Sequence, residues 1–345
     1  MSRRSQILTK GSCGFSVVEL MVAVTLSLIL LGGVVAMFAN SRKAYETTDK
    51  VSLIQETGQF ALDQISRDIR AAGYVGCARA PTYISSSLNN SASMIWNFLD
   101  GPVRGFQSSG AGAWTPALDA SVTNAASGSD VLVLRIPARE AQPLRVTTAM
   151  SNGQDNIQVE NVSGGLKAGD VALAYSCEAQ AYFQVTSFSG GTITHTTAAG
   201  TPGNATDNIS YAFRENAEVI PVQTVIYYVR ASQNIPGLNS LWRKSGANAA
   251  EELVEGVEQM QLQFGVDTTG DSVVDQYRTA NNVTNWANVY SITAALLVRS
   301  LESYGNDLDN REYQLLDVNV PAAADRHLRQ AFVVTANLRN RVPVN

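Results

Sequence analysis

The chain opens with a short polar stretch that is followed by a long run of apolar residues. Between residues 15 and 39 only Glu19 is ionisable. A helix of this length measures about 37 Å at about 1.5 Å per residue, which exceeds the roughly 30 Å thickness of a bilayer core. The pattern therefore predicts a membrane-spanning helix over residues 15–39 that carries one carboxylate near its start.

The stretch before the apolar run, residues 1–14, is basic. It contains Arg3, Arg4 and Lys10 and no acid. A secretory signal peptide also begins in this way, but its apolar region usually has roughly 7–15 residues, and no small-x-small cleavage site follows the run here. We therefore expect the apolar segment to stay attached, with its basic side in the cytoplasm.

Beyond residue 39 the apolar positions recur at steps of three and four, which is typical of one face of an amphipathic helix. These positions are Val51, Ile54, Gly58, Ala61 or Leu62, Ile65, Ile69 and Ala72. No proline occurs before Pro81, and Gly73 is a suitable C-terminal stop. We predict one helix from about Phe15 to Ala72, whose part over residues 40–72 packs on a globular domain.

The remainder of the chain has β character. Tyr74–Ala126 is rich in small and polar residues and predicts irregular loops with short elements. Short runs rich in apolar residues then occur at Val131–Ile136, Val171–Tyr175, Tyr182–Phe188 and Val225–Val229, and a Thr-rich segment, Thr192–Thr197, follows a Gly190-Gly191 turn. Period-two alternation follows at Met260–Val266, Tyr290–Val298 and Leu328–Leu338, which indicates half-buried antiparallel strands.

These patterns together predict an α+β fold. A long N-terminal helix, membrane-spanning in its first half and amphipathic in its second, packs on a large antiparallel β-rich domain over residues 73–345. Two lobes, about 73–215 and 216–345, are expected within it. The 345 residues, 45% of them hydrophobic, suffice for this architecture.

Charge and composition argue against two function classes. The net charge is −5, which disfavours nucleic-acid binding. The chain has only two histidines, His195 and His327, both expected at the surface or hydrogen-bonded, and no nucleophile motif. We therefore expect no enzyme activity, no small-molecule substrate and no cofactor.

The three cysteines predict one disulfide. Cys13 lies in the basic stretch before the apolar run, and Cys77 and Cys177 lie beyond it. An exported domain lies in an oxidising compartment, where a bridge over a loop of about 100 residues would stabilise the fold by roughly 4–5 kcal/mol. The alternative is two buried free thiols.

The sequence Gly14-Phe15-Ser16-Val17-Val18-Glu19-Leu20 resembles the cleavage signature of type IV pilins and pseudopilins. The resemblance implies that residues 1–14 are a leader, which a prepilin peptidase removes by cutting between Gly14 and Phe15. It also implies that the new terminal Phe15 is N-methylated. Glu19 would then pair with the terminal amine of a neighbouring subunit during assembly.

Further segments are similar to PilW-type minor pilins. They are Ala72–Cys77, Gly169–Val171, Ser176–Cys177, Phe183–Thr186, Leu253–Glu258, Gln263–Asp267, Arg329–Val333 and Leu338–Asn340. The resemblance implies a pilin-like subunit that waits in the inner membrane, its globular domain periplasmic. It would then join other minor pilins and the major pilin in a priming or tip complex for pilus biogenesis, twitching motility and adhesion. The alternative is a J-type pseudopilin of a type II secretion system.

One loop offers candidate metal ligands. Asp267, Thr269, Asp271 and Asp275 place side-chain oxygens at alternate positions, as a calcium loop does. The EF-hand pattern fails, because glycine stands at the fourth place and arginine at the twelfth. The two interpretations are a polar turn between strands and a Ca²⁺ site, which would make the chain a Ca²⁺-dependent binding module displayed on the pilus.

The C-terminus is locally basic, with Arg326, Arg329, Arg339 and Arg341. This group could contact DNA or a partner. The alternation of the last strand places Arg329 and Arg339 on its outer face, so we expect a solvated surface there.

Overall fold

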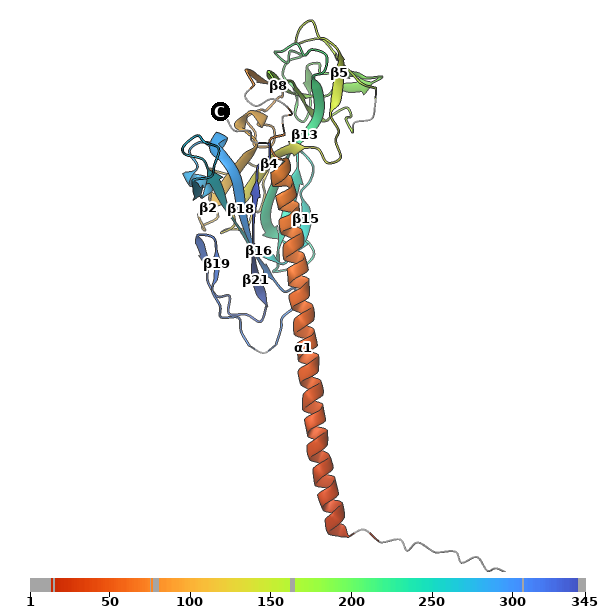
Figure 1. Ribbon diagram of the computed structural model, residues 1–345, viewed down its shortest axis with the longest axis vertical. Helices are drawn as coiled ribbons and strands as arrows, with labels where there is room; N and C mark the ends of the chain where they lie inside the picture. The colour runs from red at the N-terminus through yellow and green to blue at the C-terminus, as the bar shows by residue number, and fades with distance from the viewer. Residues whose placement is uncertain are drawn as a thin grey trace, which may run out of the picture. The chain divides into compact units, whose positions relative to one another are not determined.

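The structure is a computed structural model that describes residues 14, 16–74, 76, 81–161, 165–305 and 307–340. The described residues form one long helix, three short 3₁₀ helices and 21 strands. The chain divides into two compact units, Met1–Ser52 and Leu53–Asn345 (Figure 1). The α+β prediction is confirmed, since one apolar N-terminal helix accompanies a large domain of antiparallel sheets.

The helix α1 (Val17–Ala71) agrees within two residues with the predicted helix. It ends where expected, because Gly73 takes the left-handed conformation with φ of 72° that favours glycine. Asn340, from the other end of the chain, donates hydrogen bonds of 3.2–3.3 Å to the carbonyls of Arg70, Ala71 and Ala72. These carbonyls have no partner inside the helix, so Asn340 satisfies the helix C-terminus.

A 13-stranded sheet contains most of the strands. They are β1 (Tyr83–Ser86), β2 (Val103–Ser108), β3 (Trp114–Thr115), β4 (Val131–Pro137), β5 (Leu144–Thr148), β6 (Ile157–Val159), β7 (Val171–Tyr175), β8 (Ala179–Gln184), β9 (Ser187–Ser189), β10 (Thr192–Thr194), β13 (Glu218–Ala231), β14 (Asn239–Ser245) and β15 (Glu251–Glu255). Only the β1–β8 pair in this sheet is parallel. The long strand β13 pairs with β5 and β7 at its start and with β4 and β14 further along.

A second sheet of four antiparallel strands has the order β17 (Gln276–Arg278), β16 (Val257–Val266), β18 (Val289–Arg299) and β21 (Arg329–Asn337). Its last three strands are those that the period-two alternation predicts. The remaining elements are β11 (Ala198–Ala199) with β12 (Gly203–Asn204), β19 (Tyr313–Leu315) with β20 (Val318–Val320), and the 3₁₀ helices η1 (Phe98–Asp100), η2 (Ala280–Asn282) and η3 (Trp286–Asn288).

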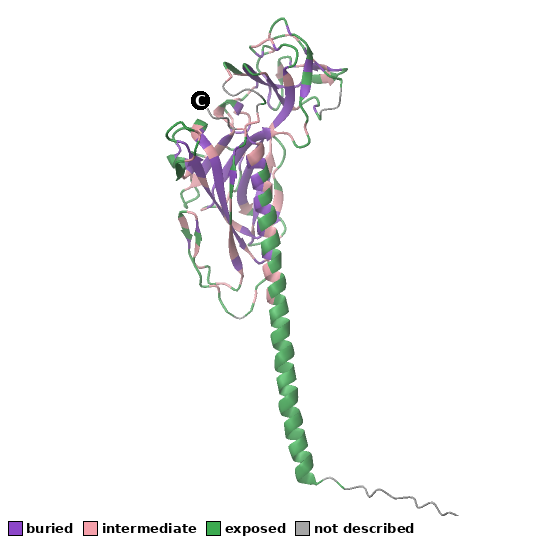
Figure 2. Ribbon diagram, viewed as in Figure 1, coloured by how far each residue is buried: buried purple, intermediate pink, exposed green. Residues whose placement is uncertain are grey.

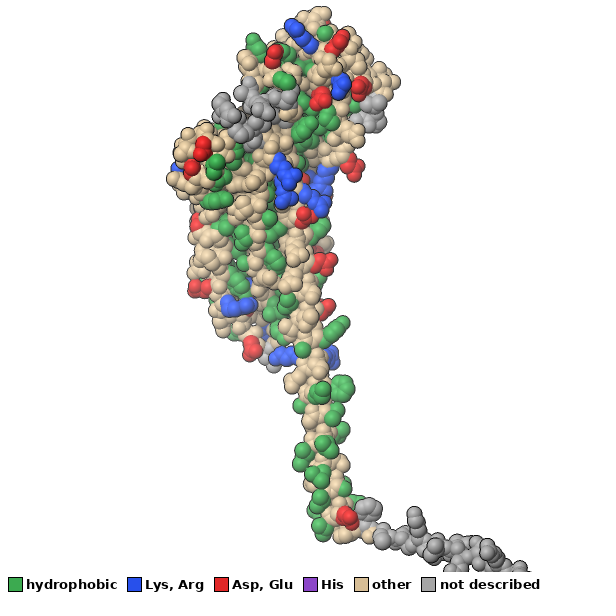
Figure 3. Space-filling view, viewed as in Figure 1, with side chains coloured by type: hydrophobic (Ala, Val, Ile, Leu, Met, Phe, Trp, Pro, Cys, Tyr) green, Lys and Arg blue, Asp and Glu red, His purple; other side chains and the backbone are tan. Residues whose placement is uncertain are grey.

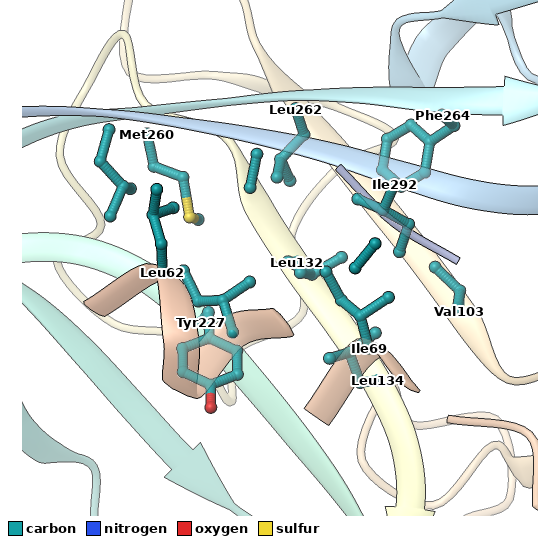
Figure 4. Packing of buried hydrophobic residues seen from close by; sticks show 14 of the residues in the cluster. Leu62, Ile69, Val103, Leu132, Leu134, Tyr227, Met260, Leu262, Phe264 and Ile292 are labelled. Atoms are coloured by element: carbon teal, nitrogen blue, oxygen red, sulfur yellow. The ribbon is translucent and has the colours of Figure 1, made fainter. Parts of the chain in front are cut away.

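The largest core joins the last part of α1 to both sheets. Leu62 and Ile69 from the helix, Leu132 and Leu134 from β4, Tyr227 from β13, and Met260, Leu262, Phe264 and Ile292 from the four-stranded sheet meet there (Figure 4). Burying each such side chain contributes about 1.5–3 kcal/mol. The purple segments of Figure 2 mark these positions, and the predicted helix stripe is buried from Ile54 to Ala72. Val51 is half-buried.

A separate core lies between Leu144 and Val219 and draws on β5, β6, β7, β8 and β10. The predicted lobe boundary near residue 215 falls just before β13. Since β13 pairs with strands of both regions, a single strand connects the two cores, and the division into two lobes stays a prediction.

The region 74–126, expected to hold irregular loops with short elements, contains the short elements β1, η1, β2 and β3, and Val103 and Phe106 of β2 are buried in the large sheet. The expectation of a solvated Arg329 is wrong. Its side chain is 3% exposed and donates to Glu258 and Asp325 at 2.6–2.9 Å. The outer face of the four-stranded sheet is covered at this point by the β19–β20 hairpin, so alternation alone misjudges it.

Candidate assembly site

The first part of α1 presents apolar side chains on all its faces. Fifteen large apolar residues between Val17 and Phe38 are about half exposed or more. Of the described residues, α1 is the one helix long and apolar enough to cross a membrane. Figure 3 shows hydrophobic side chains along this part of the helix. Exposing so large an apolar surface to water is unfavourable, so this segment is suited to a lipid bilayer or to packing against other apolar helices.

Glu19 lies in the first turn of α1 and is exposed. Ser16 caps the helix, because its hydroxyl accepts from the backbone N–H of Val18 at 3.3 Å and its carbonyl accepts from Leu20. Ser16 and Glu19 therefore stand at the first and last places of a Ser-x-x-Glu capping box. The sequence contains this signal, and a glutamate at this place favours the start of a helix, besides its predicted role in assembly.

The last turns of α1 are fixed to the sheet by a buried charge that the stripe analysis missed. Asp68 is 5% exposed. Its Oδ2 accepts a hydrogen bond of 2.6 Å from the Tyr227 hydroxyl and two of 3.3 Å from Arg243. Burial and the nearby Asp68 carboxylate raise the pKa of Tyr227, so the phenol stays protonated and donates. Asp68 comes seven residues after Ala61 and three after Ile65, which places it beside the apolar face, and this position was the available signal.

A close contact sets the distance between α1 and β21. A Cβ built on Gly58 would lie 2.5 Å from the ring of Phe332, so only glycine lets the helix approach this strand so closely. The opposite face of the helix keeps two large apolar residues outward, Leu53 at 48% and Phe60 at 49% exposure. α1 thus has one face fixed to its own domain and, on the opposite face, two exposed apolar side chains among charged ones.

Several predicted site residues lie at the limits of the described chain. Gly14 is described and exposed, whereas Phe15 lies outside the described residues. Cys77 does too, so the Cys77–Cys177 disulfide stays a prediction. Cys177 itself is in the short connection between β7 and β8.

The four residues of the candidate calcium loop do lie in one loop between β16 and β17. Burial acts to raise the pKa of Asp267, but the N–H groups of Gly270, Ser272 and Thr269 donate to its carboxylate and lower the pKa. The Asp275 carboxylate likewise accepts from Thr268. The loop's own N–H groups therefore occupy lone pairs that a cation would need.

The two histidines are hydrogen-bonded, as expected. Nε2 of His195 lies 2.9 Å from the Asp155 carbonyl oxygen, and Nδ1 of His327 lies 3.0 Å from that of Ser300. Among the described residues no group of three or more His, Cys, Asp and Glu side chains is placed to hold a metal ion.

The fold and the helix together define a class, namely an α+β protein with an N-terminal helix able to cross a membrane. Residues 226–340 match the family model PilW, described as Type IV Pilus-assembly protein W. The match covers a third of the chain, from within β13 to the last described residues, and supports a PilW-type type IV pilus protein. Four of the segments that carried the sequence resemblance fall inside it. No curated protein and no solved structure matched the chain.

Proposed function

We propose that the chain is a minor pilin of the type IV pilus, a non-catalytic subunit that acts in a priming or tip complex. The observation that carries this proposal is an apolar helix, exposed on all faces, with its one carboxylate in the first turn. A helix of this kind is suited to lipid before assembly and to other α1 helices afterwards. The PilW match over residues 226–340 supports the pilus setting.

The proposed mechanism assigns a task to each part of α1. The segment over residues 15–39 anchors the subunit in the inner membrane after prepilin peptidase has cut between Gly14 and Phe15. Glu19 then neutralises the methylated Phe15 amine of a neighbouring subunit, because a carboxylate inside an apolar surrounding seeks a partner. The outward Leu53 and Phe60 extend the apolar contact beyond the membrane segment. The partners are other minor pilins and the major pilin.

The assembly role is tested by comparing wild type with Glu19→Ala in a deletion strain. Filaments sheared from the cells are blotted for the chain, and protease resistance of the membrane-bound subunit reports that the β domain is folded. We expect a folded subunit that is depleted from filaments at least tenfold. Normal incorporation of Glu19→Ala would contradict the proposal.

The phenotype of the deletion strain separates the pilus from the type II secretion system. Loss of pilus extension and twitching motility with normal secretion is the expected result. Lost secretion with normal motility would instead assign the chain as a J-type pseudopilin. Mass spectrometry of the mature N-terminus, with a methylated Phe15 expected, tests the processing that both assignments share.

A further inference from the structure

A cleft of ≈ 690 Å³ lies within the unit Leu53–Asn345, away from the outward face of α1. Side chains from β1, η1, β4, β8 and η3 line it, together with the segment that follows η1. Those used below are Ile84, Leu99, Arg104, Arg135, Tyr182 and Trp286. The volume lies in the range of roughly 300–1,000 Å³ that is usual for ligand sites.

The charged groups that line the cleft are unequal in number. Asp100, Arg104 and Arg135 are the ionised residues among the described lining. Nε of Arg104 lies 2.8 Å from the Asp100 carboxylate, and Nη2 of Arg135 lies 3.9 Å from it. One acid thus faces two bases, and the cleft carries a positive charge in a protein whose net charge is −5. An anion is the complementary ligand.

Arg135 is the deepest of these groups, with its side chain 5% exposed. Its Nη1 donates to the Gly101 carbonyl at 2.6 Å, but its buried Nε has no hydrogen-bond partner among the described residues. Burial lowers the pKa of Arg135 to about 10, so the guanidinium is still cationic at neutral pH. A buried hydrogen-bond donor without a partner destabilises the fold. A carboxylate bound in the cleft could accept a hydrogen bond from this Nε and remove that cost.

The rest of the cleft mixes apolar and aromatic side chains with polar ones such as Gln180 and Asn285, and it extends to the surface. Phe98 stacks on Tyr182 with ring centroids 5.0 Å apart, and the Arg104 guanidinium lies 5.2 Å from the ring centre of Trp286. At the rim, Ile84 is 53% and Leu99 51% exposed. Exposed apolar side chains at the rim can contact a ligand that extends out of the cleft, so they favour a ligand longer than the cleft.

Ile84 also belongs to a free sheet edge. Among the described residues β1 pairs with β8 alone, and it is the last strand on its side of the large sheet. The backbone N–H groups of Tyr83 and Ser87 point to β8, where they donate to Glu178 and Tyr182. Because backbone groups alternate in direction along a strand, those of Ile84 and Ser86 point away from β8, where an extended chain can pair with them.

From these observations we infer that the cleft binds an extended peptide of a partner protein, in which a carboxylate stands beside apolar side chains. The carboxylate reaches Arg104 and Arg135, the apolar side chains fill the space between Tyr182, Trp286, Ile84 and Leu99, and the peptide backbone runs along β1. The proposed peptide contact does not involve α1. The inference therefore does not depend on the proposed role of α1 in assembly.

The test uses the full chain in lipid nanodiscs and two pooled libraries of blocked pentapeptides. One pool has a central glutamate flanked by varied apolar residues, and the other has glutamine at that place. Peptides retained on the immobilised protein are counted by mass spectrometry, with empty nanodiscs as the blank. We expect the glutamate pool to be enriched at least tenfold over the glutamine pool. Equal enrichment, or no retention of either pool, would overturn the inference.

Three variants, at the exposed Ile84 and the half-buried Arg104, locate the binding. Ile84→Asp places a negative charge at the rim, which repels the carboxylate of the peptide, and Ile84→Asn is its matched neutral control. Arg104→Gln removes one positive charge and leaves the buried Arg135 in place. We expect at least fivefold loss of the enrichment for Ile84→Asp and Arg104→Gln, and a smaller loss for Ile84→Asn, which removes the apolar contact but adds no charge. Unchanged melting temperatures show that these variants fold. Retention that none of the three alters would place the peptides elsewhere and refute the site.

Discussion

The hydroxyl of Tyr227 donates a hydrogen bond of 2.6 Å to the buried carboxylate of Asp68. The two residues lie 159 positions apart and connect the end of α1 to the middle of β13. Arg243 on the neighbouring strand β14 completes the group at 3.3 Å. The charge pair is therefore part of the interface that joins the helix to the β domain.

Removing the carboxylate should weaken this interface strongly. Asp68→Ala removes the buried partner of the Arg243 guanidinium and leaves it the mostly exposed Glu251 carboxylate at 3.3 Å, and breaking a buried pair typically costs about 3–5 kcal/mol. We expect a loss of about 3 kcal/mol in the free energy of unfolding, measured by urea titration of the full chain in nanodiscs with tryptophan fluorescence. The control is Asp63→Ala, whose exposed pair with Arg67 should contribute less than about 1 kcal/mol. Equal effects of both substitutions would refute the anchoring role.

The contact between Gly58 and Phe332 gives a second prediction. Gly58→Ala would normally favour a helix by about 1 kcal/mol, but here the added methyl meets the ring at 2.5 Å. We expect a net destabilisation of about 1–3 kcal/mol in the same urea assay. Gly33→Ala is the control, because nothing lies within 4 Å of a Cβ at that position. Since Phe332→Leu shortens the ring side chain, it should recover part of the loss, and a stabilising Gly58→Ala would show that the contact is not tight.

How much of this architecture was predictable depends on how local its causes are. The helix and the strands β16, β18 and β21 were predicted from periodicity, although β18 is buried on both faces. The strand β13 was predicted only over Val225–Val229, since most of it is buried on both faces and lacks alternation. The partners of Asp68 and Arg329 come from distant segments, so no local pattern could supply them. The cleft around Arg135 was missed for the same reason.

Asp130 gives the fold a pH dependence. Burial raises the pKa of this carboxyl to about 7, although it accepts from the backbone N–H groups of Ser108 and Leu262 at 2.9 Å. The folded state therefore holds a proton that the unfolded chain loses near pH 4. The contribution of Asp130 is complete below about pH 4 and decreases as the pH rises to about 7, by at most on the order of 4 kcal/mol.

The measurement is a series of urea titrations between pH 4.5 and 7.5. We expect stability to fall across this window in the wild type and to change less in Asp130→Asn, whose amide does not titrate. Carboxyl groups whose pKa is lowered by folding, such as Asp325, change the stability only below about pH 4, which is outside this pH range. A wild-type profile that rises with pH, or one that Asp130→Asn leaves unchanged, would contradict the assignment.

The loop between β16 and β17 allows a prediction about calcium. Because backbone N–H groups already occupy the carboxylates of Asp267 and Asp275, we expect 5 mM Ca²⁺, a concentration on the order of the weakest extracellular Ca²⁺ sites, to leave the melting temperature within about 1 °C of the calcium-free value. Asp271→Ala should melt alike with and without the ion. A clear rise with Ca²⁺ that Asp271→Ala abolishes would instead support the displayed binding module.

The central claim is that the charge of Glu19 serves assembly, and the capping box makes Glu19→Gln its sharpest test. Glutamine fits the last place of the box as glutamate does, so the helix start keeps its local support while the charge is lost. The measurement is the amount of the chain in sheared filaments relative to the membrane pool. The account predicts that Glu19→Gln is depleted from filaments as strongly as Glu19→Ala. Wild-type incorporation of Glu19→Gln would contradict it and leave Glu19 with a capping role alone.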